Sequence, residues 1–127
     1  MPKVDISEPL PGSEPGCKTL HDVSVDGAYA GKLDVCLLRK EDVKLFKGLT
    51  RGKLKRKLEV GKPFSVRLIL EPERGLPLSR LGKDGVLAIV DAVMSKLEGM
   101  DESELYVLEL LPDGRKQLLG KGHELRV

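Results

Sequence analysis

The segment from Asp84 to Glu98 constrains the fold more than any other part of this sequence. Its large apolar residues recur at the i, i+3, i+4 and i+7 positions that share one side of a helix. These residues are Val86, Leu87, Ile89, Val90, Val93, Met94 and Leu97. Asp84 suits the start of such a helix and Gly99 suits its end. An apolar helix face this wide needs a second layer to cover it, so we expect a helix that packs on a sheet.

Segments with a two-residue apolar period lie on both sides of this helix. The clearest is Phe64–Leu70, where Phe64, Val66, Leu68 and Leu70 share one strand face. Further strands are expected at 21–25, 33–38, 105–111 and 116–119, and a short edge strand at 76–81. The pattern predicts an α+β fold with a mixed or antiparallel sheet and one main buried amphipathic helix.

Turn residues separate these strands at two places. Asp26-Gly27 predicts a hairpin, because glycine accepts a positive φ without steric cost, although the loop is expected to be longer than two residues. Pro112-Asp113-Gly114 predicts a second turn, in which proline fixes φ and aspartate bonds the following backbone.

The chain length of 127 residues fits one domain. Residues 1–16 contain four prolines, which predicts an extended or disordered arm without regular pairing. Residues 17–127 then form a single α+β domain. No apolar run approaches the roughly 18 residues of a membrane span, and no secretory signal is expected at the N-terminus. The sequence therefore predicts a soluble, cytoplasmic protein.

Charge is concentrated in one segment of the chain. Residues 39–62 carry ten basic and three acidic residues, whereas the whole chain has a net charge of only +2. Clustered lysine and arginine attract polyanions or an acidic protein surface. The candidate contacts are Lys53, Lys55, Arg56 and Lys57. A solvated helix face is the alternative interpretation of the same segment.

Motifs for common enzyme chemistry are mostly absent from the sequence. It contains no glycine-rich phosphate loop that leads into a helix. Cys17 and His21 have the spacing of half a zinc site, but structural zinc needs four ligands, usually in two close pairs. We therefore expect no metal site and no cofactor from these patterns. Whether the protein is an enzyme stays open, and the patterns favour one that is not.

Carboxylates on the predicted helix are the one pattern that suits catalysis. Asp84, Asp91 and Glu98 are spaced by seven residues, so they lie along one line of the helix. Asp101 and Glu102 follow closely. Such acids would bind Mg²⁺ if they converged, because this ion prefers oxygen ligands. A solvated polar stripe is the simpler interpretation and the one we favour.

The segment from Pro63 to Val127 resembles ubiquitin-like β-grasp modules, in particular Ras-association domains. The resemblance rests on the order of hairpin, helix and further strands, on the strand 105–111 with its Pro-Asp-Gly turn, and on His123-Glu124-Leu125. It implies a module that binds a partner protein by strand addition at a sheet edge, here the expected strand 76–81.

The same region is similar to the RusA family of Holliday-junction resolvases. The similarity rests on strand 64–70, on Asp84-Gly85, on Asp91-Ala92-Val93, and on Asp101-Glu102 about ten residues later. It implies that Asp84, Asp91, Asp101 and Glu102 hold Mg²⁺ for phosphodiester cleavage in branched DNA. The basic segment would then follow the phosphates.

The sequence thus leaves two functions of different classes open. The leading one is a non-enzymatic binding module that docks an acidic protein surface or a nucleic acid through the basic segment and a sheet edge. The alternative is a Mg²⁺-dependent endonuclease of RusA type, active or degenerate.

The basic segment generates a prediction about salt dependence. Changing Lys53, Arg56 and Lys57 to alanine should flatten the slope of log affinity against log salt concentration for a polyanionic partner, because fewer counterions are released on binding. Titration of duplex, branched and single-stranded nucleic acid at several salt concentrations measures this slope. A wild-type protein without affinity for any of them at low salt would exclude nucleic acid as the partner.

Overall fold

The computed structural model describes residues 2–12, 18–37, 40, 60, 63–97 and 99–126. The basic-segment residues Lys53, Lys55, Arg56 and Lys57 lie outside these described residues, so their expected role stays a prediction. Within the part of the chain that is described, no helix has the length and apolar character needed to cross a membrane.

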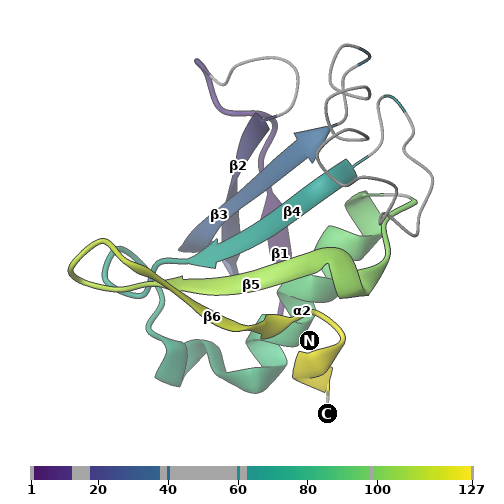
Figure 1. Ribbon diagram of the computed structural model, residues 1–127. Coiled ribbons are helices and arrows are strands. Elements are labelled where there is room, and N and C mark those ends of the chain that lie inside the picture. The colour runs from purple at the N-terminus through teal and green to yellow at the C-terminus, as the bar shows by residue number, and fades with distance from the viewer. Residues whose placement is uncertain are drawn as a thin grey trace.

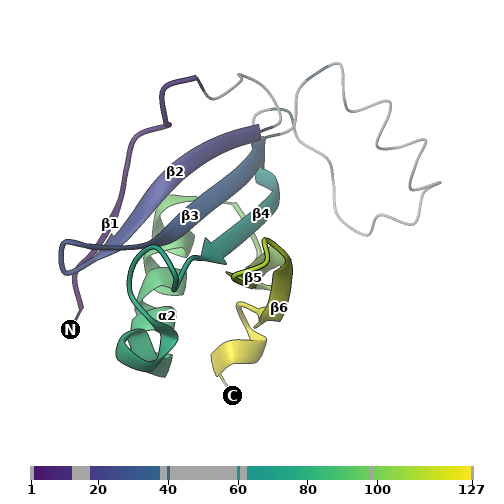
Figure 2. The ribbon, with the colours of Figure 1, turned by 90° about the vertical axis from the view of Figure 1, so that its left-hand side faces the viewer.

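The described strands form one mixed sheet with the helix α2 packed on one face, which confirms the predicted α+β class (Figure 1). The six strands lie in the sheet in chain order. They are β1 (Val4–Ile6), β2 (Lys18–Val25), β3 (Ala28–Leu37), β4 (Pro63–Leu70), β5 (Leu105–Leu110) and β6 (Lys116–Lys121). The sheet is twisted and curves around α2 (Figure 2).

Neighbouring strands are antiparallel except for β4 and β5, which run parallel. Parallel strands need a crossover connection, and α2 (Leu78–Lys96) supplies it. Two short 3₁₀ turns, η1 (Glu102–Glu104) and η2 (Glu124–Arg126), precede β5 and follow β6.

The core lies between α2 and the face of the sheet toward it. Ile89, Val90 and Val93 on the helix are fully buried, as the predicted apolar spacing requires. Alternate residues of the strands meet them, because successive side chains of a strand point to opposite faces. Fully buried strand residues include Leu33, Val66, Leu68, Leu105 and Val107. We call this the core face of the sheet and the opposite one the outer face.

The hairpin between β2 and β3 is tighter than expected. Val25 pairs with Ala28, so Asp26 and Gly27 alone make the turn. Their φ angles are 51° and 83°, which is the positive-φ pair of a type I′ turn. The expected longer loop is wrong, because this turn matches the strand twist and lets β3 begin at Ala28.

The expected edge strand at 76–81 is also wrong, because α2 already begins at Leu78. Pro77 stands directly before the first helical residue, where its missing N–H is no loss. Gly82, at a φ of 67°, then interrupts the helical conformation, and the regular helix continues into the predicted segment. The partner-binding edge expected at this segment therefore does not exist.

The N-terminal arm is paired rather than unpaired. Val4–Ile6 pair antiparallel with β2, and the Leu10 N–H donates to the carbonyl of Leu20 at 2.9 Å. Val4 and Ile6 pack against the core. The prediction of an arm without regular pairing is wrong for these residues, since Pro2 and Pro9 flank the strand and leave its ladder intact.

This arm generates a stability prediction. Replacing Val4 and Ile6 together by alanine should lower the free energy of unfolding by about 1–3 kcal/mol, because partly buried methyl groups are lost. Asp5→Ala on the same strand is the control, since Asp5 is exposed. Denaturant titrations measure both. Equal stability of the double variant and the control would show that the strand contributes no packing.

Candidate functional site

Three of the four acidic residues that the sequence proposes as metal ligands lie in two separate contacts. Arg126 of η2 donates from Nη2 to Asp91 of α2 and from Nε to Glu102 of η1, the latter at 2.5 Å. The arginine therefore joins three elements and occupies both carboxylates. This contact links residues 35 positions apart, so no local sequence signal announces it.

Asp101 has a different role. Its carboxylate accepts from the Ser103 N–H at 2.9 Å and from the Ser103 hydroxyl at 2.8 Å, and it thereby caps η1. These hydrogen bonds lower the pKa of Asp101. Asp84 is exposed on α2. Among the described residues, no three acidic, histidine or cysteine side chains converge to hold a metal ion.

Of Cys17 and His21, which suggested half a zinc site, only His21 lies among the described residues. His21 is buried, and its Nδ1 lies 2.8 Å from the carbonyl oxygen of Ser7. Cys36, the second cysteine of the chain, is disulfide-bonded, so its sulfur is not available as a thiolate ligand that would complete such a site.

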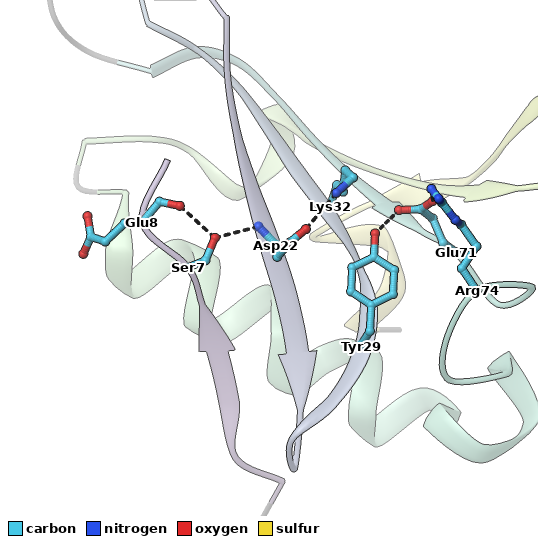
Figure 3. Close-up of polar contacts among 7 residues, drawn as sticks. All are labelled: Ser7, Glu8, Asp22, Tyr29, Lys32, Glu71 and Arg74. Carbon is cyan, nitrogen blue, oxygen red and sulfur yellow. Dashed lines mark hydrogen bonds and ion pairs between the residues drawn. The ribbon is translucent and has the colours of Figure 1, made fainter. Parts of the chain in front are cut away.

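The outer face of the sheet carries a network of polar side chains between β2, β3 and the turn after β4 (Figure 3). Lys32 donates to Asp22 at 2.7 Å and lies 5.6 Å from the centre of the Tyr29 ring. The Tyr29 hydroxyl donates to Glu71, and Arg74 donates to the other oxygen of Glu71 at 3.3 Å. The network thus holds the 71–76 turn against β3.

Backbone contacts reinforce this connection. The Leu76 N–H donates to the Tyr29 carbonyl at 2.8 Å. A side chain at Gly75 would meet the same carbonyl at 2.0 Å, so only glycine allows the approach. Glu71 is 4% exposed, and burial together with the bond to this carboxylate raises the pKa of Tyr29. These contacts fix the turn that leads into α2, so the network positions the start of the helix.

Strand β6 is the last strand of the sheet, and no described residue pairs with its far side (Figure 1). The Leu111 N–H donates to the Arg115 carbonyl at 2.8 Å, which sets the hydrogen-bonding phase of the β5–β6 hairpin. Bonded and non-bonded pairs alternate along an antiparallel ladder. Lys116 and Leu118 therefore direct their backbone N–H and C=O groups away from β5.

Side chains on the outer face of this edge are apolar and basic. Leu118 pairs with Leu108 and is 54% exposed, and Tyr106 on β5 is 38% exposed. Lys121 pairs with Tyr106, and its ammonium lies 5.6 Å from the ring centre. Lys116, at the other end of the strand, is exposed. We call Lys116–Lys121 with Tyr106 the β6 edge.

The N-terminal edge of the sheet is less suitable for a partner. β1 has three residues and is flanked by Pro2 and Pro9, which have no N–H to donate to an added strand. The β6 edge was missed from the sequence because edge position depends on strand order. The Pro-Asp-Gly turn predicted this hairpin but not its place at the end of the sheet.

The fold and this edge define an α+β protein with a mixed six-stranded sheet and an open C-terminal edge. No family model, no curated protein and no solved structure matches the chain. The resemblances to β-grasp modules and to RusA resolvases therefore stay predictions.

The Tyr29–Glu71 contact generates a prediction about pH. Because the folded pKa of Tyr29 is raised, its contribution to stability is complete below the ordinary tyrosine pKa of about 10 and falls as pH rises above it. In a Tyr106→Phe variant, Tyr29 is the sole tyrosine. As pH rises, tyrosinate absorbance should then appear only above the ordinary tyrosine pKa, and it should appear together with loss of ellipticity. Ionisation near pH 10 in a folded protein would contradict the contact.

Proposed function

We propose that this protein is a non-enzymatic binding module that docks an extended, acidic segment of a partner protein along the β6 edge. The observation that carries the proposal is the open backbone of Lys116 and Leu118 beside the exposed side chain of Leu118. Strand addition of this kind gains affinity from main-chain hydrogen bonds. Exposed strand edges are otherwise shielded in proteins because they promote association.

Charge complementarity selects the acidic partner. Lys116–Lys121 contains two lysines and no acidic residue. Both lysines share the outer face with Leu118, since their paired residues Leu110 and Tyr106 alternate with the buried Leu105 and Val107. A partner strand with acidic residues on this face would pair with the lysines and cover the exposed leucine. The basic segment at 39–62 is a second proposed contact for the same acidic partner.

The endonuclease alternative is not proposed, because Asp91 and Glu102 already bind Arg126. The expected cytoplasmic location is not part of this proposal, because Cys36 is disulfide-bonded and cytosolic thiols are mostly kept reduced. The disulfide favours an oxidising compartment.

The test measures fluorescence anisotropy of short labelled peptides that alternate apolar and glutamate residues. Wild-type protein should bind the glutamate peptide better than a matched lysine peptide. Lys116→Ala should weaken binding by about two- to fivefold, the range of an exposed ion pair. Lys96→Ala, an exposed lysine at the end of α2, is the matched control and should leave affinity unchanged.

Backbone pairing has its own control. A glutamate peptide that is N-methylated at alternate amides keeps its charge but loses the donors for one strand edge. It should lose binding, because strand addition depends on those donors. Equal affinity of methylated and unmethylated peptides would exclude strand addition. Binding of nucleic acid without binding of any peptide would exclude a protein partner.

A further inference from the structure

A cavity of about 480 Å³ lies beside the β6 edge, between α2, β6 and η2. Its walls are mainly aliphatic, and they are formed by Leu78, Val86, Leu87, Leu119 and Leu125. Lys83 and Glu124 add one positive and one negative side chain. A volume of roughly 300–1,000 Å³ with mostly apolar walls and few polar groups is typical of ligand sites.

Two irregularities of the chain, one in α2 and one in β6, shape this cavity. Gly82 breaks the helical conformation of α2, and both Leu78 before it and Val86 after it line the space. The β5–β6 register passes from Leu108–Leu118 to Val107–Gly120, so Leu119 is the extra residue of a β-bulge. Its side chain lines the cavity, whereas Leu118 is exposed on the outer face.

The wall from η2 is fixed independently of any ligand. Arg126 joins η2 to α2 and η1 through Asp91 and Glu102. The Glu124 carboxylate accepts from the Lys121 N–H at 2.8 Å. A side chain at Gly120 would lie 3.1 Å from a methyl carbon of Leu125, so Gly120 lets this leucine approach β6. The cavity is thus largely pre-formed.

The position of the cavity relates it to a strand added at the β6 edge. Such a strand would lie about 4.8 Å from β6, with successive side chains on opposite faces of the sheet. Residues on its outer face would meet Lys116 and Leu118. Residues on its core face would point toward the side of the sheet where α2 and Leu119 form the cavity. The Glu124 bond to the Lys121 N–H ends the available edge next to this opening.

We propose that this cavity is a specificity pocket that takes one large aromatic side chain from the core face of the added strand. The inference rests on the proposed strand addition and extends it to a sequence preference. An aromatic residue is favoured because the volume exceeds that of one aliphatic side chain, and aromatic anchors bury 150–250 Å² each. The partner segment then alternates glutamate on the outer face with apolar residues, one of them aromatic, on the core face.

The experiment uses tryptophan as the anchor, because this chain contains none and the peptide supplies the sole indole signal. Two peptides of identical composition differ only in that the tryptophan is moved by one position. A one-residue shift transfers a side chain to the other face of the sheet. We call the peptide whose tryptophan falls on the core face the in-phase peptide. It should bind about tenfold more tightly than the other peptide, and its tryptophan should show blue-shifted emission and resist acrylamide quenching.

A variant that fills the cavity gives a second measurement. Val86→Phe should reduce affinity for the in-phase peptide to that of an alanine-anchor peptide, whereas the alanine-anchor peptide should bind wild type and variant equally. Circular dichroism checks that the variant folds. The comparison of the two tryptophan peptides uses wild-type protein, so its result does not depend on this variant. Equal affinity and equal quenching of the two tryptophan peptides would overturn the pocket assignment.

The outcomes separate this inference from the proposed function. Loss of binding on N-methylation without any effect of tryptophan position would keep strand addition and reject the pocket. No peptide binding at all would reject both. Sedimentation that shows a dimer in the absence of peptide would reject the peptide and assign the edge to a second copy of the chain.

Discussion

The parallel pairing of β4 with β5 is the constraint on which the rest of the described structure depends. Two parallel neighbours cannot be joined by a tight turn, so the chain must cross from one end of the sheet to the other. α2 makes this crossing, and its fully buried residues Ile89, Val90 and Val93 cover the core face. Burial of side chains of this size contributes roughly 1.5–3 kcal/mol each before entropy is subtracted. The position of α2 is also fixed at two places, the turn that leads into the helix and its second half.

Those places are held by polar contacts that lie outside the core. At the start, Tyr29 and Arg74 bind the buried carboxylate of Glu71 and fix the turn that leads into α2. In the second half of the helix, Asp91 binds Arg126, which also binds Glu102 on η1. A buried carboxylate is stable only when it has partners, so the network around Glu71 also favours one arrangement of this turn.

Strand order then determines which surface is available to a partner. Because the strands lie in chain order, the short β1 and the C-terminal β6 form the two edges. Successive side chains of β6 point to opposite faces of the sheet, so Leu118 is exposed on the outer face and Leu119 lines the cavity toward α2. The proposed docking of an acidic strand and the proposed aromatic pocket use these two faces of the same edge strand.

Local patterns in the sequence determined the helix face, five of the strands and the positions of both turns. These features depend on neighbours in the chain: the helical spacing of Ile89, Val90 and Val93, the alternation in 64–70, and the glycine at the Asp26-Gly27 turn. Local patterns failed at Val4–Ile6, where prolines suggested an unpaired arm, and at 76–81, where Pro77 suggested an edge strand instead of a helix start. Only the tertiary structure decided that Arg126 occupies Asp91 and Glu102, that Tyr29 meets Glu71 and that β6 is an edge. The physical reason is that these contacts join residues 24 to 42 positions apart, and no short-range preference specifies which distant segments meet.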